Sequence, residues 1–283
     1  MPDLPKFQHL RAVVFDWAGT VIDFGSHAPM GAFVRLFAEE GVAISIEEAR
    51  VPMGLPKWEH IEALLNAPRI TEAWARAKGA VPTREDVDRL YARFTPMSAA
   101  AVREHATLIP GVAELVSALR EAGLKIGSTT GYNRAVMAEL VPLAAAQGFA
   151  PDAIICADDV PESRPSPLAL YRCLLDLAVW PSHAVVKVDD TVPGLLEGAH
   201  AGCWTVGVLA SGNEAGLTLE AWQAMNAAER AQVRRRVAER LDAAHPDALI
   251  DTVADLPGVL ASIEARLARG ERPRGSSMTS ADE

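Results

Sequence analysis

Acidic and hydroxyl side chains stand directly after three short apolar runs of the sequence. Asp16, Thr130 and the pair Asp189 and Asp190 each close such a run. Ligands bind beyond the carboxyl ends of strands in open α/β sheets, so these residues meet if the runs are adjacent parallel strands. Carboxylates that lie close together need a cation to stay ionised, and their oxygens suit Mg²⁺. Taken singly, each aspartate could instead be a helix cap or turn residue; the ordered set favours a magnesium site.

A second pair of reactive side chains, Lys57 and His60, lies farther along the chain. Pro56 suits the first position of a helix, which puts Lys57 in the first turn and His60 on a neighbouring face. The positive helix end and burial both disfavour an ammonium group, so the pattern is compatible with a neutral amine that attacks a carbonyl. The alternative is a solvated lysine beside a packed histidine.

The elements that must position these residues follow a βαβ alternation. Short β-branched runs bounded by Gly, Asp or Pro are typical of buried parallel strands, and helical periodicity fills the intervals. The expected strands are 11–15, 124–128, 152–156, 183–188, 203–209 and a short last one at 248–250. The expected helices of this part are 112–122, 133–147, 167–178, 219–244 and 256–268. The pattern predicts an α/β fold with a doubly wound, Rossmann-like parallel sheet.

One interval breaks the alternation. Between about 26 and 104 the patterns are only helical, at 29–40, 56–65, 70–78 and 83–105, with Thr95-Pro96 as a point of interruption. This is too long for a strand crossover. We therefore expect an all-helical cap domain over 25–105, inserted into an α/β core made of 1–24 and 106–283, with 270–283 as a flexible tail.

Composition sets limits on partners and location. The chain has 283 residues, 49% of them hydrophobic, and 37 acidic against 27 basic residues give a net charge of −10. Such a charge disfavours nonspecific binding to nucleic acid or anionic lipid. The three cysteines are far apart, and no apolar run is long enough for a signal peptide or a membrane span. These features favour a cytoplasmic protein with reduced cysteines.

The motif Asp16-Trp17-Ala18-Gly19-Thr20, followed by Thr130, Arg164 and Asp189-Asp190, resembles the haloacid dehalogenase-like superfamily. The resemblance implies that Asp16 is a nucleophile that becomes phosphorylated and is then hydrolysed. Phosphatases of that superfamily carry a second Asp at the position of Ala18, where it acts as general acid, a role worth typically ~10²–10⁴-fold. Ala18 therefore indicates a leaving group that does not need this acid.

Together with the stretch around Lys57, these segments resemble the phosphonoacetaldehyde hydrolase family over about residues 8 to 268. The resemblance implies cleavage of a P–C bond to acetaldehyde and phosphate, through a Schiff base on Lys57 and an aspartyl phosphate on Asp16. It implies His60 as proton shuttle and a homodimer in phosphonate degradation. The implied Mg²⁺ ligands are Asp16, the Ala18 carbonyl, Asp190 and, directly or through water, Asp189. The implied substrate-binding residues are Thr130, Gly131, Arg164, Met53 and Tyr132.

Two positions depart from the family pattern or have an open role. Some members carry a second acidic residue at the position of Gly194, and here the pair Asp189-Asp190 is expected to substitute for it. Ser26 corresponds to a small residue near the active site, and its role is open.

Other functions remain to be weighed. Another capped phosphatase or phosphomutase is disfavoured by Ala18, and a metal-free dehalogenase by the basic Arg164 with paired acids. A phospho-acceptor switch resembling a receiver domain would also pair aspartates with Thr and Lys, but it would not need eighty helical residues.

Overall fold

The computed structural model describes residues 4–275 and contains one six-stranded sheet in the order β3-β2-β1-β4-β5-β6. All neighbouring strands are parallel. The strands are β1 Ala12–Phe15, β2 Lys125–Thr129, β3 Ala153–Ile155, β4 Val185–Asp189, β5 Trp204–Val208 and β6 Ala248–Ile250. The predicted doubly wound parallel sheet is confirmed, because the chain winds to one side of β1 through β3 and then to the other side from β4.

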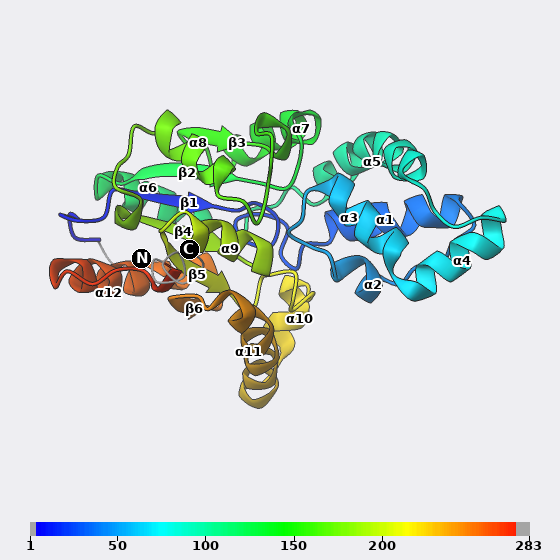
Figure 1. Ribbon diagram of the computed structural model, residues 1–283. Helices are drawn as coiled ribbons and strands as arrows, with labels where there is room; N and C mark the ends of the chain where they lie inside the picture. Colours follow the sequence, from blue (N-terminus) through cyan, green and yellow to red (C-terminus); the bar gives the residue numbers. More distant parts are fainter. Residues whose placement is uncertain (1–3, 276–283) are drawn as a thin grey trace.

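Helices cover both faces of the sheet (Figure 1). The α-helices of this part are α6 Val112–Glu121, α7 Arg134–Ala146, α8 Leu168–Asp176, α9 Val192–His200, α10 Leu219–Ala224, α11 Ala227–Leu241 and α12 Leu256–Ala268. Alternate β1 residues point to opposite faces. Val13 and Phe15 pack with α6, α7 and α12, whereas Ala12 and Val14 pack with α8. The three cysteines are buried and free of disulfides.

The helices between β1 and β2 gather at one end of the sheet (Figure 1). They are α1 Ala28–Glu39, α2 Ile46–Arg50, α3 Lys57–Asn66, α4 Pro68–Lys78 and α5 Arg84–Glu104, and we call them the helical insert. The insert has its own hydrophobic cluster, in which Phe33, Phe37 and Phe94 are fully buried. A segment with its own buried cluster can move as a unit against the sheet.

Three local features differ from the sequence expectations. Helix α5 runs through Pro96 without interruption, because α5 packs against α1, α3 and α7. Helix α2 was not expected; a capping box between Ser45 and Glu48 starts it. The expected helix 219–244 is divided, because Asn226 caps a new helix there.

Strand register explains why the acidic residues meet. Phe15 of β1 pairs with Ser128 on one side and with Val188 on the other. The next residue of each strand therefore lies at the same level, which places Asp16 between Thr129 and Asp189. Within residues 4–275, no helix is both long and apolar enough to cross a membrane.

Candidate active site

Three carboxylates lie together at the carboxyl end of the sheet. One side-chain oxygen from each of Asp16, Asp189 and Asp190 lies within 4.8 Å of the others, and all three residues are buried. Burial, followed by the charge of Asp189, raises the pKa of Asp16 to about 6. Burial, followed by the charges of Asp16 and Asp189, raises the pKa of Asp190 well above its ordinary value. The cluster is compatible with a metal site, because a bound cation would relieve this repulsion.

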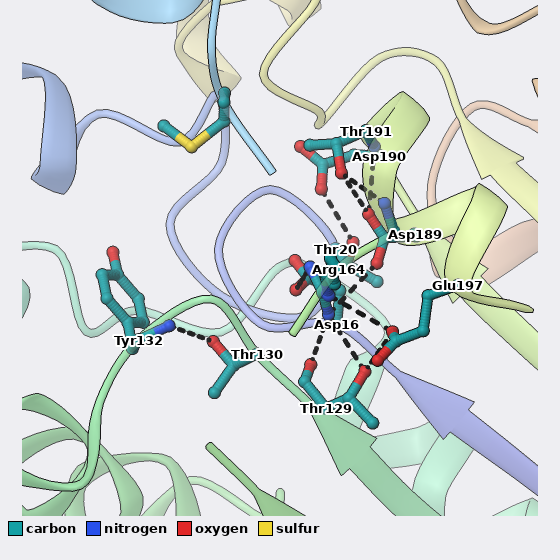
Figure 2. Close-up of polar contacts among 12 residues, drawn as sticks. Asp16, Thr20, Thr129, Thr130, Tyr132, Arg164, Asp189, Asp190, Thr191 and Glu197 are labelled. Carbon is teal, nitrogen blue, oxygen red and sulfur yellow. Dashed lines mark hydrogen bonds and ion pairs between the residues drawn. The ribbon is translucent and has the colours of Figure 1, made fainter. Parts of the chain in front are cut away.

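Arg164 lies at the centre of the cluster (Figure 2). Its Nη1 lies 2.8 Å from Asp16 Oδ1, and its Nη2 lies 3.4 Å from Asp189 Oδ2. Its Nη2 also donates to the Thr129 carbonyl at 2.7 Å. Burial alone would lower the pKa of Arg164, but Asp189, Asp16 and Glu197 raise it above its ordinary value. The guanidinium is therefore a fixed cation next to Asp16.

A buried layer behind Arg164 contains residues to which the sequence analysis gave no role: Lys187, Glu197 and Thr129. Lys187 Nζ donates to Thr129 Oγ1 at 2.7 Å and lies 3.1 Å from Asp189 Oδ2 and 3.2 Å from Glu197 Oε2. Thr129 Oγ1 donates to Glu197 Oε2 at 2.7 Å and accepts from Arg164 at 3.0 Å. The sequence did contain a signal for this layer: Lys187 lies inside the apolar strand β4 and Glu197 inside helix α9. Charged residues in such buried positions are usually paired with each other.

Asp189 and Asp190 are held differently. Asp189 Oδ1 accepts from the backbone N–H and the hydroxyl of Thr191, at 3.0 and 2.8 Å. Burial raises the pKa of Asp189, but Arg164 and Lys187 outweigh that effect and lower it. Asp190 accepts from Thr20 Oγ1 at 3.2 Å and from the Asn213 N–H at 2.6 Å, and within residues 4–275 it forms no ion pair. Among the three clustered carboxylates, Asp16 and Asp189 thus pair with a basic side chain, and Asp190 does not pair with any within residues 4–275.

The space beside Gly194 is occupied by the side chain of Asp189. A Cβ added at Gly194 would overlap the carboxylate of Asp189. The side chain of Asp189 therefore fills the volume that an acidic residue at position 194 would occupy. Asp189 places a carboxylate in the same region from the strand end instead of from helix α9.

Lys57 approaches the site from the helical insert. It is only 7% exposed, and its Nζ lies 3.5 Å from Met53 Sδ and 5.5 Å from the centre of the Tyr132 ring. Within the described chain no carboxylate forms an ion pair with it. Burial, opposed by the charge of Asp16, lowers the pKa of Lys57 to about 8. An appreciable fraction of the amine is therefore neutral near neutral pH, as attack on a carbonyl requires.

His60 is fully buried inside the insert. Its Nε2 bonds to the Ala49 carbonyl at 2.9 Å, and its ring stacks on Phe33 with 4.0 Å between centroids. Nδ1 has no hydrogen-bond partner among the described residues, and burial lowers the pKa of His60 well below its ordinary value. His60 is therefore neutral, and it does not line the cavity that contains Lys57.

A single cavity joins the sheet end to the insert. It is lined by Asp16, Ala18, Ser26, Pro29, Met53, Gly54, Lys57, Thr130, Gly131, Tyr132, Arg164, Asp190 and Thr191. Nine of the eleven predicted site residues thus line one space, and the exceptions are His60 and Asp189. The free volume is about 20 Å³, room for one water molecule. A neighbouring cleft of about 370 Å³ shares Lys57 and Arg164 with the cavity.

Comparisons with known proteins agree with this geometry. The profile of the haloacid dehalogenase-like hydrolases matches residues 10–202. Phosphonoacetaldehyde hydrolase from Paraburkholderia phytofirmans is 51% identical over 94% of this chain and 100% of its own length, and the enzyme of the same name from Pseudomonas fluorescens is 47% identical over 94% of this chain and 97% of its own.

A solved structure gives the same result. A phosphonoacetaldehyde hydrolase-like protein from Oleispira antarctica superposes with a TM-score of 0.93 at 42% identity, covering 96% of this chain and 99% of that one. A β-phosphoglucomutase from Clostridium difficile has a TM-score of 0.66 at 16% identity over 92% of this chain and 99% of its own, and shares the fold alone. The chain is a hydrolase and belongs to the haloacid dehalogenase-like hydrolase family.

Proposed function

We propose that this protein hydrolyses phosphonoacetaldehyde to acetaldehyde and phosphate, within phosphonate degradation. The observation that carries the proposal is that Lys57 and Asp16 line the same cavity, while Ala18 occupies the position of the phosphatase general acid. A buried amine of lowered pKa suits an aldehyde, and a carboxylate beside Arg164 suits a phosphoryl group. The similarity to proteins named phosphonoacetaldehyde hydrolase supports the same substrate.

In the first step, the neutral amine of Lys57 attacks the aldehyde carbon, and loss of water leaves an imine. Met53 and Tyr132 cover this end of the cavity and limit the access of water to the imine. A proton on the imine nitrogen makes it an electron sink. His60 is assigned to moving protons around Lys57, as the family resemblance implies; it is neutral, its Nδ1 has no partner among residues 4–275, and it lies outside the cavity lining.

In the second step, an oxygen of Asp16 attacks phosphorus, and the electrons of the P–C bond move to the imine, so that carbon leaves as an enamine. No acid on the leaving group is needed, which accounts for Ala18. Arg164 and the Thr130–Gly131 backbone would hold the phosphoryl oxygens with charge-assisted hydrogen bonds. Protonation of the enamine carbon and hydrolysis of the imine release acetaldehyde, and water hydrolyses the aspartyl phosphate.

The carboxylate cluster fits a resident Mg²⁺. Asp16, the Ala18 carbonyl and Asp190 would hold the ion, and Asp189 would act directly or through water. The fit rests on the three clustered carboxylates and on Asp190, which is buried without a cation among residues 4–275. When bound, the ion would neutralise charge between Asp16 and the phosphoryl group.

The proposal gives the helical insert the role of a cap domain over 25–105, closing on a core formed by 1–24 and 106–283. Support comes from its separate hydrophobic cluster and from the division of the site between the two parts, with Lys57 on the insert and Asp16 on the sheet. We also propose a cytoplasmic homodimer, as the family resemblance implies; sedimentation equilibrium would test the oligomeric state.

The experiment that tests the proposal couples acetaldehyde release to alcohol dehydrogenase. With Mg²⁺ and phosphonoacetaldehyde we expect acetaldehyde and phosphate in equal amounts, and we expect EDTA to stop both. Sugar phosphates, tested in parallel, should release little phosphate. Phosphate release from sugar phosphates without acetaldehyde from phosphonoacetaldehyde would contradict the proposal and indicate a phosphatase.

A further inference from the structure

Arg50, the last residue of helix α2, reaches out of the helical insert to the sheet domain. Its Nη1 donates to the Gly25 carbonyl at 2.7 Å, to the Asn213 carbonyl at 3.2 Å and to Asn213 Oδ1 at 3.0 Å. Its Nη2 lies 3.3 Å from His27 Nδ1. One guanidinium thus joins the insert, the chain segment 25–27 that leads into it, and the loop after β5.

The acceptors around Arg50 are neutral. Its partners are carbonyl, amide and imidazole groups, and among the ion pairs of the described chain none includes Arg50. His27 Nε2 lies 3.3 Å from the Leu217 carbonyl, so Nε2 donates there and Nδ1 is free to accept from Arg50. Several acceptors in different directions match the planar fork of arginine, whereas a lysine would serve fewer of them.

The Arg50 contacts lead directly to the carboxylate site. The backbone N–H of Asn213 donates to Asp190 Oδ2 at 2.6 Å, while the side chain and carbonyl of the same residue accept from Arg50. The Gly25 N–H donates to the Ser211 carbonyl at 2.7 Å, so the 25–27 segment and the 211–217 loop are already joined beneath the guanidinium. A shift of Arg50 would therefore change the support of Asp190.

The cavity between the insert and the sheet domain is nearly filled by its own side chains. The cavity has a free volume of about 20 Å³, too little for a phosphorylated two-carbon aldehyde. The loop before α3 packs closely on the sheet domain, since a Cβ at Gly54 would lie 2.5 Å from Thr191 Oγ1. In Figure 1, α2 lies on the lower side of the insert, toward α10. Arg50 of α2 contacts Asn213 of the chain between β5 and α10.

We propose that Arg50 is a positioning residue that clasps the closed insert to the sheet domain and, through Asn213, holds Asp190 in place for the reaction. Closure of the insert over a substrate and completion of the carboxylate site are then one event. An open insert leaves the 211–217 loop without the guanidinium, so that Asp190 loses part of its support. The expected change in kcat/KM rests on the proposed function, whereas the expected changes in hydrogen exchange and Mg²⁺ affinity do not.

The test compares Arg50→Met with Arg69→Met in the full-length protein. Arg69 is a matched control because it also lies on the insert, but it pairs with Glu48 and the Ala43 carbonyl within the insert. Without ligand, we expect amide hydrogen exchange over 24–27 and 211–217 to be about tenfold faster in Arg50→Met and unchanged in Arg69→Met. Mg²⁺ binding, measured by titration calorimetry, should weaken severalfold in Arg50→Met only.

In the coupled assay, Arg50→Met should lower kcat/KM about 10- to 100-fold, the size expected for lost hydrogen bonds to a charged group. Asn213→Ala added to Arg50→Met should cost little more, because both act through one contact. Exchange, Mg²⁺ affinity and kcat/KM equal to those of Arg69→Met would overturn the clasp. If Arg50→Met does not fold, Arg50→Lys carries the same test, with faster exchange over 211–217 expected and wild-type exchange overturning the proposal.

If wild-type protein releases no acetaldehyde, the proposed function fails, and exchange and Mg²⁺ affinity alone decide on the clasp. A wild type that releases acetaldehyde together with an Arg50→Met variant that behaves as wild type would leave the proposed function standing and reject the clasp.

Discussion

At the sheet end of the cavity two buried cations, Arg164 and Lys187, have carboxylate partners. At the insert end Lys57 forms no ion pair among residues 4–275, and its amine lies beside a thioether and two aromatic rings. Lys187 and Lys57 make the contrast direct, because both are less than 8% exposed. Lys187 contacts Asp189, Glu197 and Thr129 within 3.2 Å. The paired lysine supports the site, and the unpaired lysine is left with a lowered pKa and a reactive amine.

The comparison shows two uses of burial in one site. Around Arg164, opposite charges compensate each other's desolvation, which fixes the geometry of Asp16. Around Lys57, the charge of Asp16 offsets desolvation only in part, which leaves the pKa of the amine lowered to about 8 at a cost in stability. The site therefore combines a half in which buried charges are paired with a half in which a buried amine forms no ion pair among residues 4–275.

The largest expected effect is on turnover, when either Lys57 at the insert end or Asp16 at the sheet end is replaced. Lys57→Arg and Asp16→Asn should each lower turnover at least about a thousandfold, because neither nucleophile has a substitute. With phosphonoacetaldehyde and borohydride, Asp16→Asn should still gain the substrate carbon skeleton at Lys57, detected by mass spectrometry. Lys57→Arg should gain none, since a guanidinium cannot form the imine. Labelling at another lysine would refute the assignment.

The second prediction concerns the paired lysine. Lys187→Met should lower the free energy of unfolding by about 3–5 kcal/mol, because the buried carboxylates of Asp189 and Glu197 would lose one of their two cationic partners and keep only Arg164. Urea unfolding at pH 7 measures the change. A loss below about 1 kcal/mol would show that the sheet end does not depend on pairing, and the contrast with Lys57 would fail.

The unpaired lysine should respond in the opposite direction. Lys57→Met should raise the free energy of unfolding by about 3 kcal/mol below pH 8, because the folded protein no longer has to hold an amine whose pKa is lowered to about 8 from an unfolded value of about 10.4. Between these two values the unfolded wild type binds more protons, so wild-type stability rises with pH and the advantage of the variant disappears. Urea unfolding at pH 7 and near pH 10 checks this sign; an equal advantage at both pH values would contradict it.

The same pKa sets the rate at which Lys57 reacts. Reductive trapping of Lys57 by acetaldehyde and cyanoborohydride should slow about tenfold for each pH unit below 8, so that trapping at pH 6 is about a hundredfold slower than the plateau. The neutral fraction of the amine falls in that proportion. Lys57→Arg is the control for labelling elsewhere. A plateau reached only above pH 10 would mean that burial does not activate the amine.

The smallest effect is expected at Tyr132, which lies between the two halves. Its hydroxyl is buried and has no hydrogen-bond partner among residues 4–275, so Tyr132→Phe should change the free energy of unfolding by less than about 1 kcal/mol. A fall in kcat for this variant, measured by acetaldehyde release, would then reflect contact with substrate and not altered folding. A fall of several kcal/mol in the free energy of unfolding would instead mean that the Tyr132 hydroxyl has a hydrogen-bond partner in the folded protein.

The sequence by itself determined the parallel sheet and the residues that its strand ends bring together. Apolar runs that end in Asp16, Thr130 and Asp189 are local signals, and parallel strands align their carboxyl ends. The helical position of Lys57 after Pro56 was equally local. Such features depend on neighbouring residues, so they can be read from the order of the chain.

Only the tertiary structure decided how each charge is held. Lys187, Thr129, Glu197 and Arg164 meet because four separate segments converge. Apart from Asp189, two residues along the same strand, the partners of Lys187 are distant in the sequence. Contact with neighbouring helices likewise keeps α5 intact at Pro96. The physical reason is that desolvation and pairing depend on what surrounds a group in space. For that reason two buried lysines become, in one fold, a counter-ion of two carboxylates and an amine of lowered pKa.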